Sequence, residues 1–296
     1  MMQEGGSLDT DWLQSLIYTM NEVPIRNQIV RNALRESLSS QRPKYRWKGT
    51  WTFELLPDNS LRMRDPSCSL FHEFLQSRWK CKTPVISLFT VCLVYDGNRV
   101  HYVAFVYRSD DQTLLSFDPG VGLYPHGQRT IVPYIRNTFS QLKWVSASRD
   151  VGRCHDFTFC GKRWGIQYNG DYTYSFPADA FCQTWTLFFV TRMVIQDDTS
   201  DVSFVDTWCK IHPPRREEFL LLSFVLPELR TNRSLQKQYL SQLQMSPRSF
   251  PYVLRTLTEY VESSYASTGR KPPSIRCPPV FRDIKIDGEK KKKGRL

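Results

Sequence analysis

The chain has 296 residues, of which 41% are hydrophobic and 14% aromatic, so it can bury a large core and is not intrinsically disordered. No apolar run is long enough to span a membrane, and residues 1–9 lack a secretory signal pattern. A soluble intracellular protein is therefore expected. The formal net charge of +11 favours acidic partners or nucleic acid, although a solvated basic tail explains part of it equally well.

The first 45 residues are predicted to form a helical N-terminal extension. Apolar residues recur at spacings of three and four in two runs, 12–20 and 25–38, and Pro43 ends the second. Neither run resembles a recognition element of known type.

Residues 46–212 are predicted to form the core domain. Strands and helices alternate with turn-forming residues, and residues 150–176 are expected to be a long connection rich in Gly and Tyr. The predicted elements are a hairpin at 51–64, a helix at 68–79, strands at 85–95, 100–107 and 113–117, a helix at 129–142 and a short strand at 144–148.

The remainder of the chain is predicted to be helical and then flexible. Helices are expected at 215–229, 234–243 and 250–265, which together define a helical C-terminal region at 213–265. The segment 266–296 is rich in Pro and Lys and reads as a basic, flexible tail.

Cys182 begins an apolar stretch that continues to Ile195 and is hydrophobic around most of a helical circumference, which indicates a buried helix. Ser175 or Asp179 can cap this helix, and Pro177 suits its first turn. In that turn the helix dipole and the free N–H groups favour a thiolate, so Cys182 is a candidate nucleophile. A buried structural cysteine is the alternative.

His101 and Asp118 lie on two successive predicted strands. If Asp110 and Asp111 form the tip of a tight hairpin, opposing residue numbers sum to 221. His101 and Asp118 are then diagonal neighbours on one face, within reach of a hydrogen bond. A register slip of one residue would separate them.

Nucleophilic Cys, basic His and orienting Asp form a thiol-protease triad in general form. His101 would deprotonate Cys182, and Asp118 would hold the imidazole. Alternatively, His101 is a strand-end histidine with a solvent partner, and Asp118 belongs to an Asp-Pro-Gly turn.

The order His, Asp, Cys, with the Cys at the start of a buried helix, resembles the adenovirus proteinase and ubiquitin-like-protein protease group over residues 80–200. The likeness is closer to members from large double-stranded DNA viruses, through Gly165-Ile-Gln167 and Cys182-Gln-Thr-Trp185. It implies an α+β, papain-like cysteine protease fold, in which a mixed or antiparallel sheet packs on a buried central helix carrying the Cys. The helical N- and C-terminal regions would be additions to it.

The sequence departs from this group at two places. Tyr102 stands where many relatives have Trp after the His, and Phe176 stands where many have the oxyanion Gln. We expect Gln167, with the backbone N–H of Cys182, to form the oxyanion hole if the loop 169–175 bulges outward.

The expected function is a cysteine endopeptidase that processes viral structural precursors, in the host cytoplasm or the virion. An isopeptidase acting on ubiquitin-like conjugates and a non-catalytic basic binding protein are the alternatives. The expected partners are a protein or peptide substrate and nucleic acid at the basic tail, with no membrane and an open oligomeric state. No cofactor or metal is expected, because Cys154, His155, Cys160, Cys209 and His212 lack the spacing of a zinc site.

Overall fold

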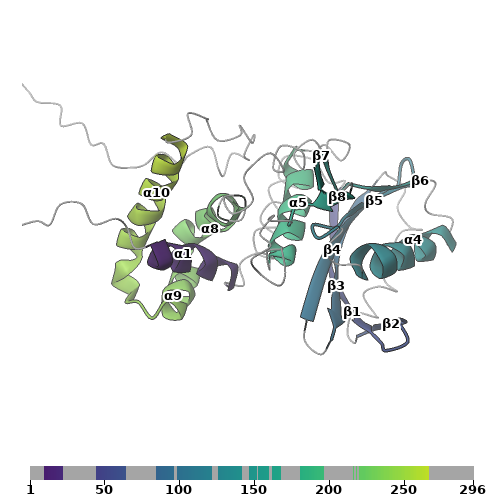
Figure 1. Ribbon diagram of the computed structural model, residues 1–296, viewed down its shortest axis with the longest axis horizontal. Helices are drawn as coiled ribbons and strands as arrows, with labels where there is room; N and C mark the ends of the chain where they lie inside the picture. Colours follow the sequence, from purple (N-terminus) through teal and green to yellow (C-terminus); the bar gives the residue numbers. More distant parts are fainter. Residues whose placement is uncertain are drawn as a thin grey trace, which may run out of the picture.

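A computed structural model describes residues 10–22, 45–64, 85–96, 99–121, 126–141, 147–151, 153–159, 162–167, 181–196, 216, 218 and 220–266. These residues form an α+β protein in which a twisted sheet carries helices on both faces, and a layer of further helices lies beyond one face (Figure 1). The predicted α+β class is confirmed.

The main sheet has six strands in the order β2-β1-β3-β4-β5-β6. It is mixed, because β1 pairs with β3 and β5 with β6 in parallel, while the other neighbours are antiparallel. The central strand β3 is buried along its whole length, as its continuous apolar sequence requires. The strands are β1 (Tyr45–Leu55), β2 (Leu61–Met63), β3 (Ile86–Tyr95), β4 (Arg99–Arg108), β5 (Thr113–Phe117) and β6 (Ala147–Asp150).

The alternation of side chains along β4 divides the core between the two faces of the sheet. Val103 and Phe105 pack on one face, against the π-helix η3 (Gly127–Ile131) and helix α4 (Val132–Gln141). Ala104 and Val106 pack on the other face, in the cluster that contains helix α5 (Cys182–Gln196). The ends of the sheet are therefore where groups from the two faces can meet.

The long connection predicted over 150–176 contains two strands in its first half, which the prediction did not include. Strands β7 (Arg153–Phe159) and β8 (Lys162–Gly165) form a separate antiparallel pair. In the sequence only two residues, one of them a glycine, separate these strands, and this hairpin signal was overlooked in the prediction.

Other boundaries shift by a few residues. The predicted helix at 129–142 begins two residues earlier, and the predicted strand at 144–148 is observed as β6. The predicted helix at 68–79 and the proposed caps Ser175, Pro177 and Asp179 lie outside the described residues.

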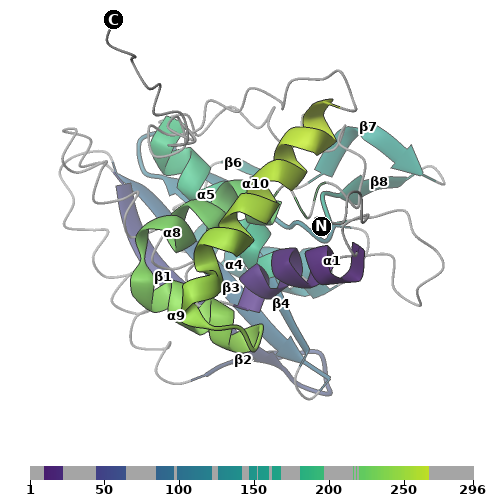
Figure 2. The same cartoon turned by 90° about the vertical axis from the view of Figure 1, so that its left-hand side faces the viewer.

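Described segments from both ends of the chain pack together as one helical layer (Figure 2). The Tyr239 hydroxyl donates to the Leu16 carbonyl oxygen at 2.5 Å, which joins the C-terminal to the N-terminal helices. The layer comprises α1 (Thr10–Tyr18), the 3-10 helix η1 (Thr19–Glu22), the π-helix η4 (Leu221–Val225), α8 (Leu226–Thr231), α9 (Arg233–Gln242), the 3-10 helix η5 (Pro247–Ser249) and α10 (Phe250–Ala266).

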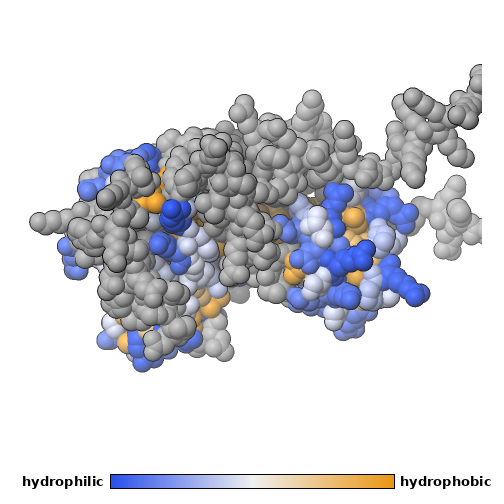
Figure 3. Space-filling model, turned by 180° about the vertical axis from the view of Figure 1, so that it is seen from behind, coloured by the Kyte–Doolittle hydropathy of each residue, from blue (hydrophilic) through white to orange (hydrophobic). Residues whose placement is uncertain are grey.

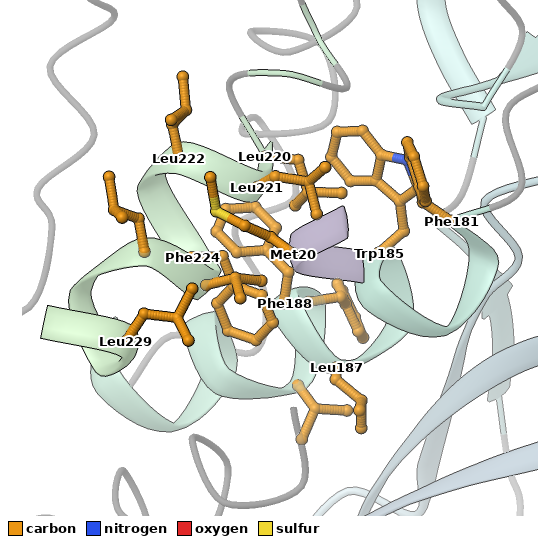
Figure 4. Close-up of a cluster of buried hydrophobic side chains, with 14 of the residues drawn as sticks. Met20, Phe181, Trp185, Leu187, Phe188, Leu220, Leu221, Leu222, Phe224 and Leu229 are labelled. Carbon is orange, nitrogen blue, oxygen red and sulfur yellow. The ribbon is translucent and has the colours of Figure 1, made fainter. Parts of the chain in front are cut away.

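The apolar side of this layer packs against α5. Met20 of η1 is completely buried and lies among Trp185 and Phe188 of α5 and Phe224 of η4 (Figure 4). From behind, the described outer surface of the layer is mostly hydrophilic (Figure 3). Helix α5 is thus shared by the sheet and the helical layer. The division into domains at 45, 212 and 265 stays a prediction.

Among the described residues, none of the helices combines the length and the apolar character of a membrane span.

Candidate active site

Cys182 is the first residue of α5. The first backbone hydrogen bond of the helix runs from Trp185 N to Phe181 O at 2.9 Å, so the Cys182 N–H lies at the open N-terminus. The sulfur lies 4.0 Å from the Val100 carbonyl oxygen of β4. The predicted position of Cys182 in the first turn of a buried helix is confirmed, and that helix brings the thiol to the end of the sheet.

His101 and Asp118 are joined at the same end of the sheet. The observed β4–β5 register pairs Ala104 with Phe117 and Phe105 with Ser116, so opposing numbers sum to 221 as predicted. His101 Nε2 lies 2.8 Å from Asp118 Oδ1, and both residues are fully buried. The hairpin register therefore produces the histidine–carboxylate pair expected from the sequence.

Backbone groups hold the Asp118 carboxylate in this orientation. The Gly120 N–H donates to Asp118 Oδ1 at 2.9 Å, which closes a tight turn after β5. Gly127, at the start of η3, packs over the other oxygen: a Cβ at this position would lie 2.1 Å from Asp118 Oδ2 and 3.2 Å from His101 Nε2. Only glycine fits against the pair here.

The surroundings of His101 favour its charged form. Burial lowers the pKa of the imidazole, but the charge and hydrogen bond of Asp118, followed by a hydrogen bond with Cys182, outweigh burial and raise the pKa to about 10. Because Nε2 is bonded to Asp118, Nδ1 is the ring nitrogen left to face the thiol. This arrangement lets the imidazole accept a proton from Cys182 and keep it.

Backbone hydrogen bonds bring Gln167 next to the residue that follows Asp118. The segment 165–167 pairs with the residues that follow Asp118, through Gly165 N to Val121 O at 2.8 Å and Gln167 N to Pro119 O at 2.9 Å. Gln167 is buried, and the neighbouring Ile166 carbonyl accepts a bond of 2.5 Å from Arg216 Nη1. The oxyanion role of Gln167 stays a prediction.

Three further residues lie at or beside this end of the sheet. Burial raises the pKa of the Tyr95 phenol, and the charge of Cys182 raises it further. The Tyr95 ring contacts the ring of His126 at 5.2 Å between centroids. Val100 is 46% exposed, although it is a large apolar residue. These side chains form an aromatic and apolar border at the end of the sheet where the sulfur meets the Val100 carbonyl.

Sequence reasoning missed the border residues and the role of Gly127. Gly127 could have been found as a glycine placed where a helical pattern begins, a position without an obvious turn to explain it. The border residues carry no such signal, because their role depends on which strand ends meet. Within the part of the chain that the structure describes, no group of three or more His, Cys, Asp or Glu is placed to bind a metal ion.

The sequence matches no protein-family model and no curated protein. Among solved structures, it is similar to the Legionella pneumophila effector protein RavZ. One RavZ structure aligns at a TM-score of 0.36 with 8% identity, over 66% of this chain and 58% of that one. Another aligns at 0.31 with 13% identity, over 71% and 64%. The chain thus spans less than two thirds of the RavZ chains, and a likeness at this level establishes neither a common fold nor a common activity.

Proposed function

We propose that the protein is a cysteine peptidase with Cys182 as nucleophile, His101 as general base and acid, and Asp118 as the residue that orients the imidazole. The observation that carries the proposal is the buried 2.8 Å contact of His101 with Asp118, at the end of the sheet where α5 presents Cys182. A nucleophile at the start of a central helix and a base on the adjoining sheet is also the papain-like arrangement that the sequence resemblance implies.

The residues act in a fixed order in the proposed reaction. His101 accepts the thiol proton, and the thiolate attacks the substrate carbonyl carbon to form a tetrahedral oxyanion. The imidazolium then gives its proton to the leaving amine as the C–N bond breaks, which leaves a thioester on Cys182. His101 next takes a proton from water, and the resulting hydroxide attacks the thioester and releases the acid product and the thiol. The Cys182 N–H and the Gln167 side chain would stabilise the oxyanion.

The proposed substrate is a protein chain. The viral structural precursor suggested by the resemblance is our first candidate, and a ubiquitin-like conjugate is the second, since one triad can cleave peptide and isopeptide bonds. The border of Val100, Tyr95 and His126 supports a site that accepts extended peptide beside the thiol. Nucleic acid binding by the basic segment 266–296 remains a separate proposal.

Cys182→Ala tests the assignment, and Cys92→Ala is its control. Cys92 is also a buried free cysteine, and burial raises the pKa of its thiol. We expect Cys182→Ala to abolish cleavage and Cys92→Ala to retain it, measured with precursor proteins and with a panel of ubiquitin-like vinyl sulfones. Mass spectrometry should find the vinyl sulfone or an alkylating agent on Cys182. A well-folded Cys182→Ala protein that still turns over substrate would contradict the assignment.

A further inference from the structure

One residue before the candidate nucleophile and one residue after it in the first turn of α5 both contact the N-terminal segment. Phe181, which precedes Cys182, stacks on Tyr18 with 5.7 Å between ring centroids and 19° between ring planes. Thr184, two residues after Cys182, donates from its hydroxyl to Asn21 Oδ1 at 2.6 Å. A segment about 160 residues away in sequence therefore contacts the first turn of α5 at a residue before the thiol and at a residue after it.

The Thr184–Asn21 hydrogen bond joins α5 to another segment of the chain, unlike the bond of the next threonine on the helix. Thr184 is completely buried, so its hydroxyl meets Asn21 away from water, where the loss of a hydrogen bond is costly. Thr186, two residues further along the same helix and equally buried, satisfies its hydroxyl on the Gln183 carbonyl oxygen of α5 itself. Only the first of these two threonines joins the helix to the N-terminal segment.

The N-terminal segment is itself fixed by the helical layer. Met20, between Tyr18 and Asn21, is buried among α5 and η4, and the Leu16 carbonyl accepts a bond from Tyr239 (Figure 4). His101 and Asp118, by contrast, are held by the sheet and by η3. The thiol and its base are therefore positioned by different parts of the molecule. The turn that carries Cys182 must be placed correctly by the helical layer for the thiol to meet the histidine on the sheet.

We propose that Tyr18 and Asn21 are positioning residues, which set the distance and direction of the Cys182 sulfur relative to His101 through Phe181 and Thr184. The inference rests on the proposed function for its catalytic meaning, but the geometry of the thiol can be measured without a substrate. Reactive groups must be held within about 0.5 Å of their working geometry, so a small rotation of this turn is enough to reduce reactivity.

The test compares Thr184→Val with Thr186→Val. Both remove one buried hydroxyl from α5 with the same change of shape, but only Thr184→Val breaks the bond to Asn21. We expect Thr184→Val to lower the rate of Cys182 alkylation by iodoacetamide and kcat roughly tenfold each, with KM little changed. Thr186→Val should stay within about twofold of the wild type in both, and Thr184→Ser, which keeps the hydroxyl, should recover most of the rate. All rates are measured below the melting temperature of each variant.

Asn21→Leu and Asn21→Asp provide a second pair from the other side of the bond, should Thr184→Val fail to fold. Asn21 is only half-buried, and Asp keeps the acceptor oxygen that Leu lacks. Equal alkylation rates at Cys182 in the wild type and in folded Thr184→Val or Asn21→Leu protein would overturn the inference. If the wild type cleaves no peptide, the proposed function fails, while the alkylation rates still decide whether residues 18–21 position the thiol.

Discussion

At His101, two opposing effects act on one imidazole. Burial disfavours a charge, while the carboxylate of Asp118 at 2.8 Å and the bond with Cys182 favour it, and the second effect wins. Gly120 and Gly127 keep the carboxylate where it can act, one through its N–H and the other through the absence of a side chain. The proton affinity of this histidine is therefore a product of the turn and helix packed around Asp118.

The raised pKa of His101 predicts how activity depends on pH. His101 must be protonated to give a proton to the leaving amine. The value of kcat/KM should therefore persist through neutral pH and decline near pH 10, where His101 loses its proton. The measurement is a pH–rate profile with a peptide substrate. A decline centred near pH 6.5, the value for an ordinary histidine, would show that Asp118 does not hold the charge.

The free energy of unfolding should also depend on the protonation of His101. The folded-state pKa lies above the unfolded value of about 6.5, so the folded protein binds more protons between the two values, and the contribution of His101 falls as pH rises. It is fully present below about pH 6.5 and lost as pH passes about 10. The difference in free energy of unfolding between the wild type and His101→Gln, measured by urea denaturation across this range, should shrink with rising pH.

At the scale of elements, the site depends on two close approaches to the segment that follows β5. Helix η3 meets the Asp118 side chain through Gly127, whereas β8 meets backbone through Gly165, whose Cβ would lie 2.3 Å from Pro119 O and 2.6 Å from Val121 N. A side chain can rotate away from an intruding methyl group, but a hydrogen-bonded backbone pair must separate. We therefore expect Gly127 to matter mainly for the position of the Asp118 carboxylate, and Gly165 mainly for the stability of the backbone pairing.

Gly127→Ala and Gly165→Ala should accordingly have different effects. Gly127→Ala is expected to push the Asp118 carboxylate away from His101 and to lower kcat/KM roughly 10²-fold, with a smaller effect on stability. Gly165→Ala should reduce the free energy of unfolding by about 1–3 kcal/mol, because the pairing of 165–167 with 119–121 must open. Denaturation curves and steady-state rates for both variants check this contrast, and the same pattern of losses in both would argue against it.

At the scale of the whole molecule, α5 is the element that packs against both the main sheet and the helical layer. One side packs on the sheet through Phe117 and Phe189, whose rings stack at 4.5 Å. The other side packs on the helical layer, where Met20 lies among aromatic rings from two helices (Figure 4). The buried Arg216 adds a polar link, because it bonds to the Ile166 carbonyl beside Gln167. The helical layer therefore supports the candidate site as well as its own core.

Met20→Ala tests this shared core. Removal of a completely buried methionine should cost about 2–5 kcal/mol of unfolding free energy and affect the sheet and the helical layer together. Met63→Ala, at a half-buried position on the edge strand β2, is the control and should cost less. The measurement is chemical denaturation followed by both far-UV circular dichroism and tryptophan fluorescence. Two separate transitions in the wild type would contradict a shared core.

Short-range patterns predicted much of the framework. The apolar run after Cys182 identified α5 and placed Cys182 in its first turn, and the turn at Asp110 and Asp111 set the register that joins His101 to Asp118. These features depend on residues close in sequence, for which helix periodicity and hairpin geometry are sufficient. The β7–β8 hairpin was missed because its turn signal was read as part of a longer loop.

By itself, the sequence determined most of the main sheet, the pairing of His101 with Asp118 and the place of Cys182 at a helix start. Only the tertiary structure decided which groups surround them: Gly127 over the carboxylate, the Val100 carbonyl beside the thiol, and Tyr18 and Asn21 on the nucleophile's turn. The physical reason is distance along the chain. Hydrogen-bonded periodicity extends over a few residues, whereas contacts between residues about 160 positions apart arise only when separate elements pack around one core.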